Sequence, residues 1–496
     1  MGYIGGSPKF PRTAFSIRLL QFHHILWKNS AVAMLPFSKA LDEFLDANNP
    51  LVLIPKKNED DPEISVGTRQ WRRTLSSAVD AFREMLRREK LICDQLFGMG
   101  SMDKLADICP VCYGPHVPGK KDHEPDFIVC MDGNFQHRRH KEASLEIPET
   151  LKTPSLFVPA EEVAEMEQYM NRAYQRNNNP RDTDPCGQSH TAADDARTGG
   201  TWKECDDTGL FGMACQHDQM IRIINIVQSG EKAYFPMTMI NNLIESTKQG
   251  FSRKKLAFLY DIGCHVEKGI VRRNQFPEEL ESNLLMFGTS VFHSYVHEWS
   301  CQLKYNPRLN KGWGMSDGEG LERRWSSLSP LIGPLRYSSK NHRLVAVNIQ
   351  LEHHNEIGKT YSFRLLLHRA KHILTILKKS EAELQDIRDE TGYELSYFKE
   401  QWDRQRQIQL SAIETDTEKQ MREQVEALVE LEDKLRETHY DMIQLSQTQR
   451  RNRTEAQSQQ LGQLPDTLIS LESEIEQAIE TLGSDEFRNL AGGSGL

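Results

Sequence analysis

The sequence predicts a mixed α/β fold, because short apolar runs typical of buried strands lie between longer segments with helical periodicity. The runs at 127–131 (FIVCM) and 256–264 (LAFLYDIGC) are the strand candidates, and each delivers an aspartate at its end, Asp132 or Asp261. Segments 14–46 and 68–97 carry apolar residues at helical spacing, the second with a stripe from Trp71 to Leu86. We therefore expect residues 1–105 to form a helical region ahead of the sheet.

Residues 106–379 are expected to form the sheet-bearing core, with a loop-rich insertion at about 143–210. The insertion is rich in Pro, Asn, Asp, Gly and Thr, and it has one helical stretch near 161–174. After it, LFGMACQHD predicts a strand, whereas segments 236–248 and 279–304 predict helices. A glycine-rich loop then leads into LERRWSSLSPLIG, the predicted start of another helix, and residues 344–379 are helical and basic.

Residues 380–496 form an acidic helical tail with a coiled-coil pattern. Met421, Leu428, Leu435 and Met442 recur every seven residues, although Glu432 and His439 occupy the intervening seam positions. The GQLP segment at 462–465 is expected to break this pattern before a short amphipathic helix. The tail is either a solvated appendage or a homo-oligomerisation helix.

Length and composition narrow the class of protein. A chain of 496 residues suggests two or more domains. No apolar run reaches the roughly 18 residues that a membrane-spanning helix needs, so a membrane partner is not expected. The opening MGYIGGSPKFPRTAF lacks a charged-then-apolar signal pattern, so secretion is not expected either. Nine cysteines are too few for a disulfide scaffold and favour reduced thiols or metal ligands.

The net charge of −10 argues against a nucleic-acid partner only if it is evenly spread. Residues 251–379 hold 20 Lys and Arg against 11 Asp and Glu, a net charge of +9. Residues 380–496 hold 12 against 26, a net charge of −14. The middle of the chain can therefore bind a polyanion such as DNA.

The two aspartates suggest a reaction class. Carboxylates that converge from strand ends and a helix can hold two divalent ions, which bracket the attacking and leaving oxygens in phosphoryl transfer. Mg²⁺ (or Mn²⁺) suits such oxygen ligands. A single aspartate at a strand end is more often a turn or cap residue, so spacing alone does not decide between these readings.

Several segments together resemble the Kyakuja–Dileera–Zisupton (KDZ) transposases, DNA-transposon enzymes common in fungi. They are ADICPVCYGP, MDGNFQ, DDTGLFGMACQHD, SGEKAYFP, LYDIGC, GMSDGEGLERRWSSLSPLIGPLRYSSKNHR and LEHHN, in that order. The resemblance runs from about residue 15 to 379. It implies an RNase H-like core with a DDE triad, in which Asp132 and Asp261 are the first two metal ligands.

The third carboxylate is Glu322 or Glu319. The ERRWSS segment resembles the ER-x-F-S block of hAT transposases, which favours Glu322, and Glu322 can begin a helix whereas Glu319 lies between two glycines. Basic residues after it are candidates for phosphate contacts, although a solvated basic face is the alternative. These DNA-binding candidates are Arg323, Arg324, Arg336, Lys340 and Arg343.

Cysteine and histidine clusters predict a structural zinc site, with buried reduced cysteines as the alternative. Cys109-x-x-Cys112 is half of a tetrahedral set. The KDZ resemblance implies partners at Cys186, Cys215 and His217. Cys264 and His265 are also available, and His293, His297 and Cys301 would share one face of a helix over 279–304.

Two functions follow from these residues. The first is a DNA transposase that cuts and joins DNA at transposon ends, working in the nucleus. The second is a transposase-derived protein that binds DNA or serves a structural role without catalysis. The intact carboxylates favour the first, and the lack of a paired CxxC motif before Phe15 favours the second.

Overall fold

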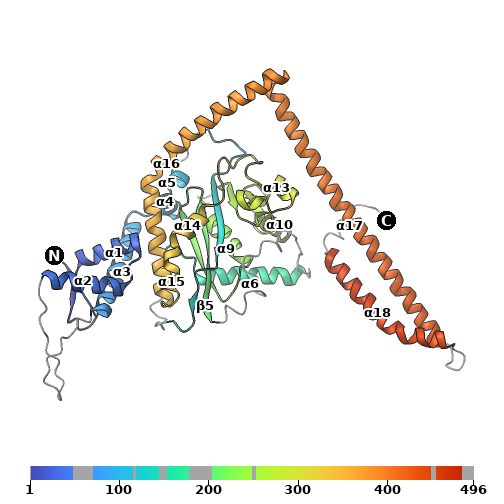
Figure 1. The fold of residues 1–496 in the computed structure, drawn as a ribbon, viewed down its shortest axis with the longest axis horizontal. Helices are drawn as coiled ribbons and strands as arrows, with labels where there is room; N and C mark the ends of the chain where they lie inside the picture. Colours follow the sequence, from blue (N-terminus) through green and yellow to red (C-terminus); the bar gives the residue numbers. More distant parts are fainter. Residues whose placement is uncertain are drawn as a thin grey trace, which may run out of the picture.

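A computed structural model describes residues 2–48, 71–115, 119–143, 153–177, 204–248, 253–447 and 454–482. Figure 1 shows a central sheet with helices around it, an N-terminal group of helices on one side, and long C-terminal helices that reach away from the core. Strands and helices are mixed along the chain, so the predicted mixed α/β class is confirmed.

The N-terminal region is a small helical unit with a two-stranded sheet. Strands β1 (Tyr3–Gly5) and β2 (Ala14–Ser16) pair antiparallel and precede α1 (Ile17–Ser30), α2 (Met34–Asn48) and α3 (Arg72–Leu96). The helical spacing over 14–46 belongs to two helices rather than one, because Ala31 adopts a left-handed φ of 48° and ends α1. The predicted stripe on α3 is confirmed, since Leu75, Val79 and Phe82 are buried in this unit's core.

The central sheet has the strand order β6-β5-β3-β7-β8. Its strands are β3 (Phe127–Asn134), β5 (Cys205–Cys215), β6 (Met220–Val227), β7 (Leu256–Leu259) and β8 (Leu285–Gly288), with β4 (Arg139–His140) beside the start of β5. Strand β5 is antiparallel to both β3 and β6, whereas β3, β7 and β8 are parallel. The sheet therefore has an antiparallel half and a parallel half that meet at β3.

Both faces of the sheet are covered, as the alternation along β3 requires. Val129 and Met131 point into a core shared with α4 (Ser101–Ile108), α5 (Pro110–Tyr113), α9 (Tyr234–Thr247) and α10 (Gly263–Arg273). Ile128 and Cys130 point to the other face, which packs against α14 (Gly320–Leu328), α15 (Ile332–Leu335) and α16 (Lys340–Thr391). Helix α6 (Ala160–Asn177), inside the predicted insertion, packs beside α9.

Two strands of the sheet, β6 and β8, were not predicted from the sequence. The helix predicted over 279–304 is wrong: the segment contains α11 (Pro277–Glu281), β8, α12 (Val291–Ser294) and α13 (Trp299–Tyr305). Strand β8 forms because its backbone pairs with β7 in parallel register, a long-range contact that local periodicity does not reveal. Strand β6 follows β5 across the short turn after Cys215 and has no alternation signal of its own.

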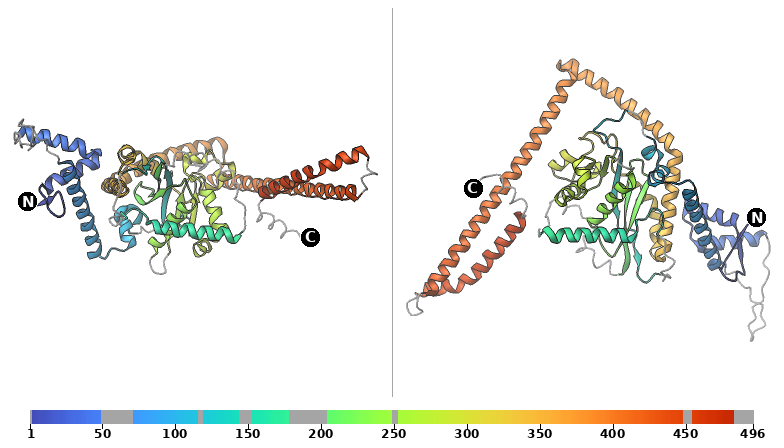
Figure 2. Two further views of the ribbon diagram at one scale, coloured as in Figure 1. Left: turned by 90° about the horizontal axis from the view of Figure 1, so that it is seen from below. Right: turned by 180° about the vertical axis from the view of Figure 1, so that it is seen from behind.

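The C-terminal tail is a helical hairpin joined to the core by one long helix. Helix α16 ends at Gly392 in a left-handed conformation (φ 71°), and α17 (Leu395–Gln447) then turns back (Figure 1). Helix α18 (Glu455–Leu482) packs along α17, and both further views in Figure 2 show the pair projecting from the core. Pro465 lies inside α18, so the predicted break at 462–465 is wrong.

The hairpin seam also differs from the predicted one. Leu428, Leu431 and Leu435 of α17 are shielded, whereas Glu432 and His439 are exposed. On α18 the buried residues are Leu464 and Leu468. The apolar seam of α17 is therefore covered by α18 of the same chain. Its intervening residue lies three positions after a heptad leucine, as Leu431 does after Leu428, rather than four positions after it as predicted. Among the helices in the described parts of the chain, none combines the length and apolarity needed to cross a bilayer.

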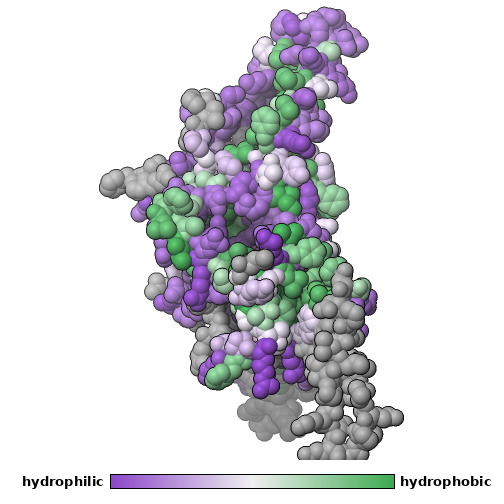
Figure 3. All heavy atoms as spheres, turned by 90° about the vertical axis from the view of Figure 1, so that its left-hand side faces the viewer, coloured by the Kyte–Doolittle hydropathy of each residue, from purple (hydrophilic) through white to green (hydrophobic). Residues whose placement is uncertain are grey.

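Helix α16 leaves the core about half-way along its length. Leu351 and Asn355 are buried, whereas Phe363, Leu367 and Leu374 are exposed. Figure 3 shows apolar side chains among polar ones up the projecting part of the molecule. The first half of α16 belongs to the core that positions the candidate site.

Candidate functional site

Asp132 and Asp261 lie near the paired ends of two neighbouring parallel strands. Cys130 on β3 pairs with Leu259, the last residue of β7. Asp132 lies two residues further along β3, and Asp261 lies in the turn two residues after β7. Adjacent strands lie about 4.8 Å apart, which brings the two backbones close together at this edge of the sheet. Asp132 follows the parity of Cys130, which faces α14, and the charge of Asp261 acts on Asp132.

Asp132 sits in a shielded acidic environment. Its carboxylate accepts a hydrogen bond of 2.6 Å from the indole N–H of Trp325 on α14. Burial raises the pKa of Asp132 well above its usual range, the negative charge of Asp261 raises it further, and the Trp325 hydrogen bond opposes both effects. Burial and the neighbouring charge therefore destabilise the ionised form of Asp132, and a bound cation would stabilise it.

Asp261 is held by two side chains from the β8–α12 segment. Ser290 donates its hydroxyl to Asp261 at 2.7 Å, and His293 Nδ1 lies 3.1 Å from the same carboxylate oxygen. The hydrogen bond to Asp261 is the largest effect on His293 and raises the pKa of its imidazole to about 9. Asp261 is therefore oriented from the side opposite to β3.

Both glutamates that the sequence offers lie near the aspartates. Glu319 precedes α14, and its carboxylate accepts from the Phe292 backbone N–H at 3.2 Å. Burial raises the pKa of Glu319, and the charges of Asp261 and Glu322 add to this. Glu322, in the exposed first turn of α14, contributes to the raised pKa of Asp132. We call Asp132, Asp261, Glu319 and Glu322 the acidic site, because the charges of Asp261 and Glu322 act on both Asp132 and Glu319. Among the described residues, the oxygens of these carboxylates do not form a group of three or more within 4.8 Å of one another.

Helix α14 reaches the sheet because β5 has a glycine opposite Asp132. Leu321, Trp325 and Leu328 form its buried face. Gly212 pairs with Asp132 in register, and a Cβ on Gly212 would lie 2.9 Å from both Leu321 and Trp325. The glycine therefore sets how closely the helix that carries the glutamates approaches the strand that carries Asp132.

Glu231 is an acidic neighbour that sequence reasoning missed. The hydroxyl of Tyr260, next to Asp261, donates a hydrogen bond to Glu231. Burial raises the pKa of Glu231, and Asp261 raises it further. The residue lies in SGEKAYFP, a segment of the KDZ resemblance, and this was the only available signal, because its position follows a strand that was not predicted.

The basic residues that follow Glu322 in the sequence have different environments. Arg323 binds Asp218 through two nitrogens, at 2.6 and 2.8 Å, and also contacts Asp317. Arg324, Arg336 and Lys340 are partly buried. Arg343 has no exposed surface and donates to the Asn225 side chain and to the carbonyls of His137 (2.7 Å) and Gly209 (3.3 Å). Arg343 is thus a core residue, which corrects its assignment to a DNA-binding surface.

Trp313 and Trp325 are both buried, at 3% and 6% exposure. Neither presents a ring face for base stacking, and Trp325 instead serves Asp132 through its N–H.

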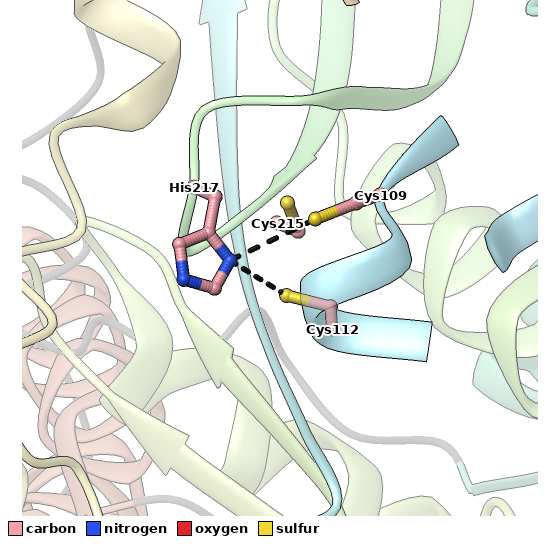
Figure 4. A group of neighbouring side chains, drawn as sticks. All are labelled: Cys109, Cys112, Cys215 and His217. Carbon is pink, nitrogen blue, oxygen red and sulfur yellow. Dashed lines mark hydrogen bonds between the residues drawn. The ribbon is translucent and has the colours of Figure 1, made fainter. Parts of the chain in front are cut away.

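Four of the five predicted zinc ligands converge, as Figure 4 shows. Cys109 is the N-cap of the short helix α5 and Cys112 lies within that helix, while Cys215 ends β5 and His217 lies in the turn before β6. Their ligand atoms all lie within 4.8 Å of one another. His217 Nδ1 is 3.7 Å from Cys109 Sγ and 3.0 Å from Cys112 Sγ. Cys186 lies outside the described residues.

This Cys₃His set can hold a metal such as zinc. Tetrahedral zinc with Zn–S of about 2.3 Å and Zn–N of about 2.0 Å separates its ligand atoms by roughly 3.3–3.8 Å, close to the distances here. Burial raises the pKa of the Cys215 thiol, and hydrogen bonds from the neighbouring thiols lower that of Cys109. A metal bound here would tie α5 to the β5–β6 turn.

The predicted stripe of His293, His297 and Cys301 is wrong, because the segment is not one helix. His293 faces Asp261, as described above. His297 and Cys301 instead meet Cys264, and the three ligand atoms lie within 4.8 Å of one another.

Comparison with known protein families finds a match for the part of the chain that holds the acidic site. Residues 125–355 match the family model of the Kyakuja-Dileera-Zisupton transposase. This region belongs to the KDZ transposase family. The KDZ match spans the whole central sheet and all four acidic residues, so the chain has a transposase-related function, and the family implies DNA binding. Searches of curated proteins and of solved structures give no significant match.

A second match covers residues 1–49, to a CxC1-like cysteine cluster associated with KDZ transposases. This segment contains no cysteine in the present chain. It forms β1, β2, α1 and α2, with an apolar core instead. Without cysteines, this segment carries no local sequence signal that would have predicted the match.

Proposed function

We propose that this chain is a DDE transposase with an RNase H-like core, which cuts and joins DNA phosphodiesters at transposon ends. The strand order supports the core assignment: an antiparallel trio β6-β5-β3 continues into parallel β7 and β8, and the first aspartate lies on the central strand. The observation that carries the proposal is that Asp132 and Asp261 each follow, by two residues, the last paired position of two adjacent parallel strands.

The acidic site suits Mg²⁺ or Mn²⁺. Its donors are hard carboxylate oxygens, which these ions prefer. Burial first and then the like charge of Asp261 raise the pKa of Asp132, and a divalent cation would offset both effects. Two such ions would stabilise the attacking and leaving oxygens of an in-line displacement. Asp132 and Asp261 would hold them, with Ser290 and His293 fixing the orientation of Asp261.

Glu322 is our choice for the third carboxylate, with Glu319 as the alternative. Glu319 already uses its carboxylate to accept from the Phe292 N–H and so anchors α12. Glu322 is exposed on the first turn of α14, and its charge acts on Asp132. It can therefore meet a DNA phosphate or a second ion without breaking an existing contact.

The DNA surface would lie around α14 and the start of α16, at Arg324, Arg336 and Lys340. Arg323 can join it by exchanging its contacts with Asp218 and Asp317 for phosphate. Arg343 stays in the core. Since the substrate is chromosomal DNA, we propose that the protein works in the nucleus.

The test is Mg²⁺-dependent nicking of a supercoiled plasmid that carries the terminal repeats flanking the gene. Asp132→Asn and Asp261→Asn should each reduce nicking by a factor of 10³ or more, since metal-assisted catalysis supplies most of the rate. Glu322→Gln should lose as much and Glu319→Gln less. Glu383→Gln, on the exposed arm of α16, is the matched control.

Each outcome discriminates. Nicking that survives Asp132→Asn and Asp261→Asn would show the triad to be wrong. A reversal of the two glutamate variants would assign Glu319. DNA binding by the wild-type chain without any nicking, under conditions that keep it folded, would favour the transposase-derived DNA-binding protein instead.

A further inference from the structure

We propose that Cys264, His297 and Cys301 form a second metal site, separate from the Cys₃His set, that binds a zinc-class ion. The three residues come from two places in the chain: Cys264 from the first turn of α10, and His297 and Cys301 from the α12–α13 segment. Their exposures are 0%, 4% and 5%, and their ligand atoms all lie within 4.8 Å of one another.

The distances and the donor types fit such an ion. Cys264 Sγ lies 3.7 Å from His297 Nδ1, close to the roughly 3.6 Å expected for a sulfur and a nitrogen on tetrahedral zinc. Thiolate and imidazole are the ligands that zinc prefers, and soft sulfur donors disfavour Mg²⁺. Three protein ligands leave one tetrahedral position for a fourth donor.

The orientation of residues 292–299 is not the one that apolar packing produces. Phe292, Tyr295, Val296 and Trp299 are 51–75% exposed, whereas Ser294 and His297 are buried. Apolar burial begins only further along α13, where Cys301, Leu303 and Tyr305 face the core. Hydrophobic burial would turn the large apolar side chains of 292–299 inward. A polar or metal-binding contact at His297 therefore accounts better for how this part of the segment meets the core.

The site would brace the loop that orients Asp261. Asp261 precedes Cys264 by three residues, and Ser290 and His293, which contact Asp261, lie just before His297. An ion that joins Cys264 to His297 and Cys301 would therefore clamp both sides of that hydrogen-bonded group. This positioning role rests on the proposed catalytic function of Asp261, whereas the metal site itself does not.

Metal content of the purified full-length chain tests the site without any activity assay. After growth with added zinc and dialysis under reducing conditions, mass spectrometry of the metals should give two zinc ions per chain. The double variant Cys264→Ser/Cys301→Ser should retain only the ion of the Cys₃His set. Cys112→Ser should lose that ion and keep the one at Cys264, His297 and Cys301. Cys130→Ala, a buried cysteine outside both sets, should keep two.

Titration with Co²⁺ gives a second reading that needs no variant to fold. Thiolate-to-cobalt absorption in the wild-type chain should keep growing past the first equivalent and saturate at two. Saturation at one equivalent, or metal content unchanged in Cys264→Ser/Cys301→Ser, would overturn the proposal. A disulfide between Cys264 and Cys301 that forms in place of metal binding would overturn it as well. If the wild-type chain binds two ions but does not nick DNA, that result would instead count against the proposed catalytic function.

Discussion

Replacing Arg343 by methionine should destabilise the core rather than weaken DNA binding. The guanidinium lies at 0% exposure and donates to Asn225, His137 and Gly209, which join β5, β6 and the β3–β4 connection to α16. A hydrogen bond from a charged donor contributes about 1.5–3 kcal/mol, and buried acceptors left without a donor add to the loss. Relief from burying the charge offsets part of it, so we expect a net loss of about 3 kcal/mol.

Thermal unfolding of the core measures this loss. For a domain of roughly 150–250 residues, each kcal/mol lowers the midpoint by about 2–4 °C, so Arg343→Met should lower it by about 6–12 °C. Lys340→Met, one turn earlier on α16 and partly buried, is the control and should shift the midpoint by no more than about 2 °C. An unchanged midpoint in Arg343→Met, together with weaker DNA binding, would refute the reasoning.

Three further predictions concern other parts of the chain. Gly212→Val should push α14 away from β5 and lower nicking at least tenfold, because its side chain would collide with Leu321 and Trp325; Gly333→Ala, with open space around it, should not, and equal rates would disprove this account. The pKa of the buried His23 is lowered to about 4, mainly by burial. As the pH falls, the unfolded chain therefore binds a proton at His23 before the folded chain does. The N-terminal unit should therefore lose stability as pH falls from about 6.5 to 4, and His23→Phe should flatten this dependence in pH-dependent unfolding. Leu468→Asp should open the α17–α18 hairpin to limited proteolysis, whereas Ile469→Asp, 65% exposed, should leave it resistant.

The sequence identified the strongest local elements of the fold. The apolar runs at β3 and β7 predicted two buried strands and the aspartates at their ends, because a strand buried on both faces must be apolar along its length. Helix α3 was predicted for a similar reason, since its stripe of Leu75, Val79 and Phe82 packs on one face. The CxxC spacing predicted Cys109 and Cys112, and the KDZ resemblance predicted Cys215 and His217, the four ligands that converge in the Cys₃His set.

The misses share a physical cause. Strand β8 has four residues and is stabilised by pairing with β7, so nothing in its local sequence distinguishes it from a helix. Pro465 was expected to break α18, but the packing of Leu464 and Leu468 against α17 holds the helix together through it. In both cases a contact with a distant segment overrides local preference.

The sequence by itself determined which residues are candidates for the chemistry: two aspartates after apolar strands, two glutamates around a helix start, and the cysteines and histidines. Only the tertiary structure decided how they are grouped. The pairing of β3 with β7 brings the ends of the two strands that precede Asp132 and Asp261 together, and Gly212 admits α14 beside Asp132. The break in the 279–304 segment places His293 at Asp261 and His297 at Cys264. The same structure moved Arg343 into the core. Charge, periodicity and spacing are local properties of a chain, whereas burial and convergence depend on which distant segments pack together.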